Sequence, residues 1–295
     1  MKLGVVFPQI EMGADPGAVR AYGQAVEQIG YHHILAYEHV VGANTASRPG
    51  WRGPYDIDSV FHEPFVLFGF LAGLTERIEF ATGIVILPQR QTVLVAKQAA
   101  ALDVLCGGRL RLGIGIGWNA VEYEALGTDF HNRGRRCEEQ VALLRALWTE
   151  RAVTFDGKWH RVTDAGIEPL PVQRPIPLWF GGGEERVLRR IARLADGWMP
   201  QFQPDTEGRA LLARMQGYAC EYGRDPAEIG LNGRMAADPR LESGWADRVR
   251  AWREIGGTHL SIDTMRLGLP DVESHVRLLE RFHAAAAEAA ERGSA

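Results

Sequence analysis

The stretch from Glu79 to Asn119 decides the fold; it opens with EFATGIVILP and closes with GGRLRLGIGIGWN. Residues 78–86 form an almost continuous apolar run rich in β-branched side chains, the pattern of a strand buried on both faces. Residues 91–105 are apolar at helical spacing, and the Gly107-Gly108 pair that follows suits a left-handed helix end. Residues 110–116 form a second buried strand that ends in alternating glycines and Trp118. The stretch therefore predicts a strand–helix–strand unit with parallel strands.

The rest of the chain repeats this alternation of short buried strands and amphipathic helices. Eight strands joined by helices in 295 residues, without the pattern of a second domain, favour a closed (β/α)8 TIM barrel over an open doubly wound sheet, so residues 1–295 are predicted to form a single domain. The remaining strands are predicted at residues 3–7, 34–37, 178–180, 197–200, 229–235 and 258–262. The remaining helices are predicted at residues 15–30, 63–74, 120–126, 137–148, 187–194, 205–222, 246–255 and from 271 to about Arg292.

Two insertions interrupt the regular alternation. The first, at about residues 40–62, contains Arg48, Trp51, Arg52 and Tyr55. These side chains could be surface decoration, but a loop of this length is unusual without a function, and a lid over a substrate is an equal alternative. The second insertion, at about residues 152–177, contains a hairpin around Asp156-Gly157 followed by a proline-rich segment.

Composition excludes several classes of protein. The net charge is −4 with dispersed basic residues, so no nucleic-acid partner is expected. No apolar run approaches the length of a membrane span, and the amino terminus has no signal-peptide pattern, so a cytoplasmic protein without a membrane partner is predicted. The chain has three cysteines, which lie far apart in the sequence. This number and spacing suggest a reducing compartment with neither disulfides nor a metal site.

In a barrel of this kind the active site lies at the carboxyl ends of the strands. The candidates by position are Glu38, His39, Gly83, Ile84, Gly117, Trp118, Gly181, Gly182, Gly183 and Met199. His39 could be a strand-end histidine bonded to backbone, or a catalytic residue beside an acidic neighbour. The glycine triplet could be a tight turn, or a phosphate site at a helix amino terminus. Glu184 and Glu185 would repel a phosphate and should then point away from it.

Several motifs together resemble a known family. They are Thr82-Gly83-Ile84, AKQAAALD at residues 96–103, Gly107 to Leu110, Gly113 to Trp118, Trp179 to Gly183 and Ala195 to Trp198. In order and spacing they resemble the luciferase-like monooxygenase superfamily, and within it most closely the branch that depends on the deazaflavin coenzyme F420. The resemblance implies a (β/α)8 barrel with insertions, F420 or FMN bound at the carboxyl ends of the strands, and a homodimer to which the helix at 63–74 could contribute.

The resemblance also implies roles for individual residues. Gly83, Ile84, Gly117, Trp118, Gly181, Gly182, Gly183, Glu184 and Met199 would bind the cofactor. A non-prolyl cis peptide is expected between Gly83 and Ile84. His39 and Glu38 would be catalytic, although the family more often has an aspartate before the histidine. Trp118 stands where sugar-phosphate oxidising members carry an acid, which argues against that substrate class.

The sequence thus predicts an oxidoreductase that transfers a hydride between F420 and an unidentified small organic substrate under the loop. The arginine-rich, lysine-poor composition fits the GC-rich organisms that often make F420. One alternative is a monooxygenase that uses reduced FMN and oxygen, and would need a flavin reductase as partner. A further alternative is a flavin-binding protein without catalysis.

Overall fold

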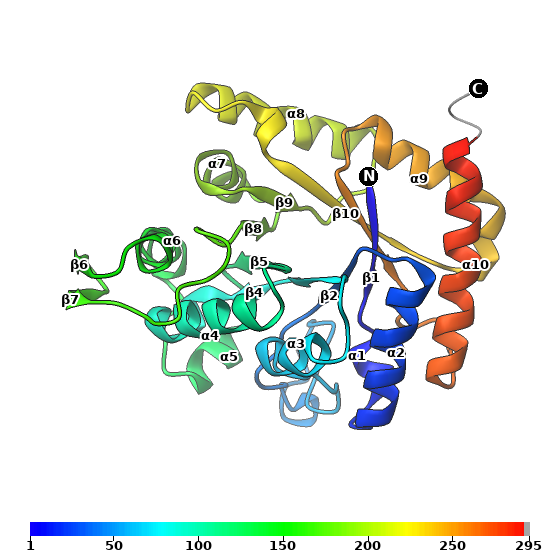
Figure 1. Ribbon diagram of the computed structural model, residues 1–295, viewed down its shortest axis with the longest axis horizontal. Coiled ribbons are helices and arrows are strands. Elements are labelled where there is room, and N and C mark those ends of the chain that lie inside the picture. The colour runs from blue at the N-terminus through cyan, green and yellow to red at the C-terminus, as the bar shows by residue number, and fades with distance from the viewer. Residues whose placement is uncertain (292–295) are drawn as a thin grey trace.

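The computed structural model describes residues 1–291, and its helices surround a central set of strands (Figure 1). The strands are β1 (Lys2–Val6), β2 (His33–Ala36), β3 (Glu79–Thr82), β4 (Val85–Ile86), β5 (Leu110–Gly115), β6 (Val153–Asp156), β7 (Arg161–Ala165), β8 (Leu178–Gly181), β9 (Gly197–Met199), β10 (Gly230–Ala236) and β11 (His259–Asp263). The α-helices are α1 (Gln9–Met12), α2 (Pro16–Ile29), α3 (Pro64–Ala72), α4 (Thr92–Leu105), α5 (Ala120–Ala125), α6 (Arg133–Thr149), α7 (Glu185–Leu194), α8 (Thr206–Glu221), α9 (Trp245–Glu254) and α10 (Val272–Glu291).

The strands close into a parallel barrel. Their order is β3-β2-β1-β11-β10-β9-β8-β5-β4, and an additional pairing of β3 with β5 joins the two ends. β3 and β4 are two halves of one strand position, so the barrel has eight positions, each followed by a helical segment or a loop. In the register, Val5 lies opposite Ile34 on one side and Ile262 on the other. The predicted (β/α)8 barrel is confirmed.

Local signals in the sequence set several helix ends. Asp15 accepts a hydrogen bond from the backbone N–H of Gly17, and Gly30 ends α2 in the left-handed conformation. Glu63 caps α3 by accepting from Val66, with Pro64 at the first helical position. These ends agree with the predicted helices to within a few residues, whereas the predicted end near Arg292 lies outside the described residues.

The third strand differs from the continuous run that the apolar pattern predicts. It breaks into β3 and β4 at Gly83-Ile84, where the expected non-prolyl cis peptide is present. A side chain at position 83 would force Leu35 to move, because an added Cβ would lie 2.1 Å from Cδ2 of Leu35. Apolar periodicity cannot reveal such a break, since the residues on both sides of it are equally apolar.

The two insertions project from the barrel in different ways. The segment at residues 40–62 is irregular apart from a short 3-10 turn at Thr45–Ser47. The second insertion forms the expected antiparallel hairpin, β6–β7, at the left edge of Figure 1 beyond α6. Among residues 1–291, no helix is both long enough and apolar enough to cross a membrane.

Candidate active site

Glycines at the carboxyl ends of the central strands make room for the side chain of Ile84. An added Cβ on Gly115 would lie 1.9 Å from Cδ1 of Ile84, and one on Gly181 would lie 3.0 Å from the same atom. The side chain of Ile84 therefore lies across the ends of β5 and β8. Met199, at the end of β9, is also close, since its Sδ would be 3.0 Å from a Cβ on Gly113. The structure brings these predicted residues together as a low, apolar surface.

Aromatic side chains surround His39 beside this surface. Its ring centroid lies 5.1 Å from that of Tyr55, 5.0 Å from Phe61 and 6.1 Å from Trp118. Trp51 lies 5.6 Å from Trp118, which remains 48% exposed. Three of these rings, those of Trp51, Tyr55 and Phe61, come from the insertion at residues 40–62. The insertion therefore folds over His39, as a lid would.

A cavity of about 190 Å³ lies between His39 and this insertion. Its lining combines apolar and polar groups, which suits a small molecule that carries a few polar atoms. The lining residues are His39, Val40, Val41, Gly42, Tyr55, Asp56, Ile57, Ser59, Phe61 and Asn119.

Glu122 fixes the orientation of His39. This buried carboxylate, on α5, lies with Oε1 3.1 Å from Nδ1 of His39 and accepts a hydrogen bond of 2.9 Å from the N–H of Val40. Because Glu122 engages Nδ1, any proton exchange with a bound molecule would use Nε2. Asn119 starts α5 by accepting from Val121, so the turn after β5 positions the carboxylate. Glu122 is not among the residues predicted from the sequence, because it has no motif of its own and lies 83 positions from His39.

Glu38 has different partners. Its carboxylate accepts a 2.6 Å hydrogen bond from the N–H of Ile86 and forms an ion pair with Arg90. Arg90 also contacts Oε1 of Glu63 at 2.8 Å, at the start of α3. Burial raises the pKa of Glu38, while Arg90 and the Ile86 amide oppose that rise. The visible role of Glu38 is thus to tie the end of β2 to β4 and α3, and a direct part in catalysis stays a prediction.

The glycine triplet forms the turn between β8 and α7. Gly182 has φ +107°, a conformation that favours glycine, and its carbonyl accepts a 2.7 Å hydrogen bond from Nε1 of Trp198. Glu184 is the N-cap of α7 and makes no side-chain capping bond. The Glu185 carboxylate is held by Tyr218 and by Arg214, 3.5 Å away, on α8. Glu185 therefore does not compete for an anion at the start of α7, where the N–H of Val187 already donates to the carbonyl of Glu184 at 2.7 Å.

A second polar group, which the sequence analysis did not single out, lies at the carboxyl ends of β2, β10 and β11. Tyr37 contacts Oδ2 of Asp263 at 3.4 Å and accepts a 2.5 Å hydrogen bond from Nη1 of Arg234. Burial raises the pKa of Asp263. Nearby, the guanidinium of Arg266 lies 5.0 Å from the Tyr55 ring and donates to the carbonyl of Pro54. Arg266 thereby attaches the insertion to the loop after β11.

Comparison with known proteins identifies the family. All 295 residues match the model of the luciferase-like monooxygenase family. The chain belongs to this family. Its members are oxidoreductases and monooxygenases, and both F420-dependent and FMN-dependent enzymes occur among the relatives of this chain.

Three relatives illustrate the range of sequence identity within the family. An uncharacterized protein of Mycobacterium tuberculosis is 38% identical over 270 residues, 88% of this chain and 91% of the relative. An FMNH2-dependent dimethylsulfone monooxygenase of Pseudomonas putida is 33% identical over 235 residues, 78% of this chain and 61% of that enzyme. An F420-dependent hydroxymycolic acid dehydrogenase of M. tuberculosis is 27% identical over 260 residues, 86% of this chain and 68% of that enzyme.

Solved structures confirm the fold. Monooxygenase RslO1 from Streptomyces bottropensis superposes with a TM-score of 0.78 at 20% identity, over 98% of this chain and 99% of that one. An F420-dependent secondary alcohol dehydrogenase superposes with a TM-score of 0.77 at 16% identity, over 97% of this chain and 98% of that one.

The residues at the strand ends fit a flavin-like cofactor. A flat ring needs a low apolar floor, and the flank of Ile84, which lies over Gly115 and Gly181, supplies one. Its phosphate needs backbone donors, and the turn into α7 is of the type that supplies them. Both F420 and FMN carry a tricyclic ring and a phosphate, so this fit does not separate them.

Proposed function

We propose that the protein is an F420-dependent oxidoreductase that transfers a hydride between the coenzyme and a small organic substrate. The observation that carries the proposal is an apolar floor, formed by Ile84 over Gly115 and Gly181, together with a histidine oriented by a buried carboxylate. The cofactor would supply the hydride chemistry at carbon five of its ring. The protein would bind, orient and shield the reactants.

His39 is the residue that we assign to proton transfer. Its Nδ1 is engaged by Glu122, and its ring lies at the cavity beneath the insertion. Nε2 would take the proton from an alcohol as it is oxidised, or return it to a carbonyl in the reverse direction. Glu122 would stabilise the charged imidazole that forms, as a carboxylate does when it orients a catalytic histidine.

The insertion at residues 40–62 would exclude water from this step. Tyr55 and Phe61 form an edge-to-face pair 4.8 Å apart beside His39, and Arg266 anchors Pro54 and Tyr55 to the barrel. A dry site strengthens the interaction between Glu122 and His39, because the local dielectric constant is low.

The FMN-dependent alternative has one specific observation in its favour. The relative that uses FMNH2 is 33% identical to this chain, against 27% for the F420-dependent dehydrogenase. A monooxygenase would use the same floor and turn, and would need a flavin reductase to supply reduced FMN. The third alternative, a flavin-binding protein without catalysis, does not account for the oriented His39.

Titration of the apoprotein with F420 and with FMN, followed by tryptophan fluorescence, tests the cofactor. Trp118 is half exposed at the site, so a bound ring should quench it. Gly115→Ala should weaken binding at least about tenfold, because the new Cβ would push Ile84 out of its place on the strand ends and into the space of the ring. Gly217→Ala on α8, where a Cβ meets nothing within 4 Å, is the matched control. Tight FMN binding without F420 binding would transfer the assignment to the monooxygenase.

Replacement of His39 by alanine tests the role of the histidine. With a substrate found in a panel of alcohols and carbonyl compounds, kcat should fall by about 10²–10⁴-fold, the usual contribution of a general acid or base. The dissociation constant of the cofactor should stay within a factor of about two, since His39 is not part of the floor. A large fall in melting temperature with an unchanged kcat would instead indicate a structural histidine.

A further inference from the structure

A second groove lies at the opposite end of the barrel from the candidate active site. It has a volume of about 440 Å³ and is formed by the amino ends of β1, β3, β5, β10 and β11 with the segments before β8 and β9. Its lining residues are Lys2, Glu79, Gly108, Arg109, Leu110, Arg111, Gln173, Pro177, Trp179, Asp196, Ala227, Glu228, Gly230, Thr258 and His259.

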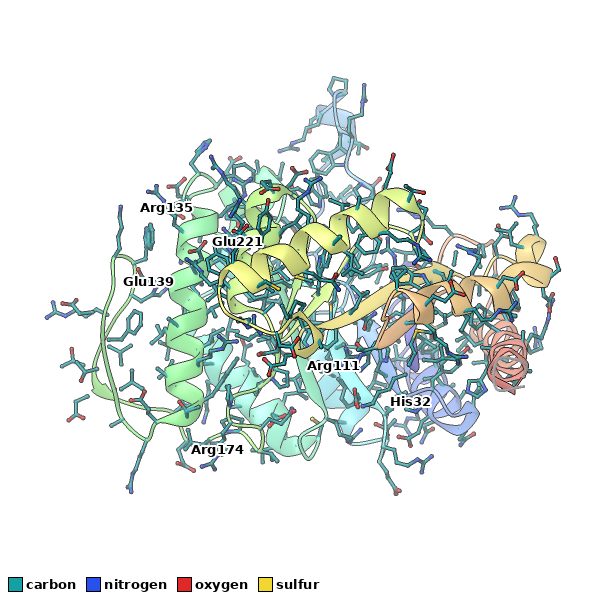
Figure 2. The ribbon with its side chains drawn as sticks, turned by 90° about the horizontal axis from the view of Figure 1, so that it is seen from above. His32, Arg111, Arg135, Glu139, Arg174 and Glu221 are labelled. Atoms are coloured by element: carbon teal, nitrogen blue, oxygen red, sulfur yellow. The ribbon has the colours of Figure 1, made fainter. Side chains whose placement is uncertain are left out.

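Arg111 is the unusual residue of this groove. It extends from β5, is buried, and lies near the middle of the molecule in Figure 2. Its guanidinium lies 4.9 Å from the centre of the Trp179 ring, and Nη1 donates a 3.3 Å hydrogen bond to Oδ1 of Asn232. Within residues 1–291, Nη2 has no hydrogen-bond partner, and Nε has only an ion-pair contact with Glu79. A buried guanidinium with an unpartnered nitrogen requires an explanation.

The surrounding charges do not compensate Arg111 fully. The only carboxylate in ion-pair contact with it among the described residues is Glu79, with Oε2 3.3 Å from Nε. Glu79 also holds Lys2, with Oε1 2.5 Å from Nζ. Two cations therefore share one carboxylate, and burial lowers the pKa of Arg111 to about 10, which leaves it charged at neutral pH.

The other charged residues of the groove do not change this balance. Arg109 adds a third cation, and its guanidinium donates to the carbonyls of Thr75 and Ile78. Asp196 accepts from the N–H of Leu178 at 2.8 Å and lies 3.4 Å from Arg145, and Glu228 is exposed at the rim. A buried charge without a full counter-charge is costly, and water can satisfy a hydrogen bond but cannot neutralise the charge.

We propose that this groove binds a small oxyanion, a carboxylate or a phosphate, through Arg111. A planar guanidinium is suited to bind such oxygens, and Lys2 would add a second positive group at the rim. The groove has far more room than one water needs, about 10–15 Å³. His259 is neutral there, because burial and the neighbouring cations lower its pKa to about 2, so Arg111 and Lys2 supply the attraction.

The bound anion would stabilise the barrel and would take no part in the reaction at the opposite end. Arg111 joins β5 to β3 through Glu79 and to β10 through Asn232, so an anion on Arg111 would hold the amino ends of these strands together. This agrees with the general division in such barrels, where the carboxyl-end face carries catalysis and the amino-end face carries stability. The expected sign of binding is therefore a higher melting temperature.

Thermal unfolding of the full chain, titrated with inorganic phosphate and separately with acetate at constant ionic strength set by chloride, tests the proposal. The melting temperature should rise saturably with at least one of the two anions, and the one that saturates at lower concentration identifies the preferred class. Arg111→Lys, which keeps the charge but removes the planar donors, should need at least about tenfold more anion. Arg161→Lys, on an exposed arginine of the hairpin, should respond as the wild type does.

Two results would overturn the proposal. One is a wild type without a saturable response to either anion. The other is an Arg111→Lys response equal to that of the wild type, which would place any bound phosphate elsewhere, for instance at the turn into α7. If Arg111→Lys does not fold, Lys2→Met serves instead, since loss of this exposed cation should weaken anion binding several-fold, and an unchanged response would contradict the proposal.

Discussion

The network of Glu38, Arg90 and Glu63 can be tested without knowledge of the substrate. Arg90→Met removes the guanidinium and keeps much of the aliphatic volume of the side chain. Glu38 is then left buried, and among residues 1–291 only the N–H of Ile86 remains to stabilise its charge. Glu63 loses an ion pair but keeps its capping bond to Val66. The variant therefore measures how much unfolding free energy is lost when a single buried carboxylate has no counter-charge.

The magnitude follows from burial. Breaking a buried ion pair by removing one partner costs about 3–5 kcal/mol. With an unfolding entropy of about 2.1 cal/mol/K per residue, this corresponds to a fall of roughly 5–8 °C in Tm for a chain of this length. The double variant Glu38→Gln/Arg90→Met should recover at least about half of the loss, because a neutral amide can still accept from Ile86.

The pH dependence gives an independent check. Burial already raises the pKa of Glu38, and removal of Arg90 removes the largest opposing effect. A raised carboxyl pKa means that the folded state of the variant binds a proton that the unfolded chain releases. Its free energy of unfolding should therefore fall as pH rises, and the deficit against the wild type should be smaller at pH 5 than at pH 8.

Urea unfolding monitored by tryptophan fluorescence at both pH values measures these quantities. Arg240→Met is the control, since the Arg240 side chain is exposed and Asp238 still accepts the backbone N–H of residue 240, so the transition should be nearly unchanged. A deficit for Arg90→Met below about 1 kcal/mol, or one that is the same at both pH values, would refute this account of Glu38.

Three further outcomes are expected. Glu122→Gln should lower kcat about tenfold with little change in KM, because a neutral acceptor supports a charged His39 less well by about 1.4 kcal/mol; an unchanged kcat in steady-state assays would contradict this. Val66 and Phe70 lie one turn apart on α3, and Val66 is 71% exposed; we expect light scattering to give a dimer for the wild type and a monomer for Val66→Asp. Burial lowers the pKa of His275 to about 4, so between pH 6 and 5 the wild type should lose about 1 kcal/mol more unfolding free energy than His275→Asn, and parallel curves would exclude the effect.

The barrel could be predicted from the sequence because its signals are local. A strand such as β5 is buried along its whole length, so its apolar run is visible without knowledge of its neighbours. Helix ends at Asp15, Gly30 and Glu63 have their causes within a few residues. The placement of candidate site residues at strand ends then followed from the architecture alone.

The contacts that define the site could not be predicted in this way. Glu122 meets His39 across 83 positions, and the backbone N–H of Arg266 meets Glu11 across 255. A glutamate in a short helix has the same local pattern whether it faces water or a histidine. Glu38 shows the converse, because its place beside His39 in the sequence suggests a catalytic pair, whereas its carboxylate faces Arg90 and Ile86.

Glu122 also contacts both the candidate catalytic histidine and the start of the insertion that covers it. One oxygen, Oε1, faces both Nδ1 of His39 and the N–H of Val40, the first residue of the insertion at 40–62. The orientation of His39 and the position of Val40 therefore both depend on this one carboxylate oxygen. Arg266 fixes the far part of the insertion at Pro54, so the insertion is attached to the barrel at two places that flank the cavity. If the insertion opens by carrying Val40 away from α5, we expect His39 to lose its orienting partner at the same time, so that closure of the insertion would be coupled to the proton transfer that we propose for His39.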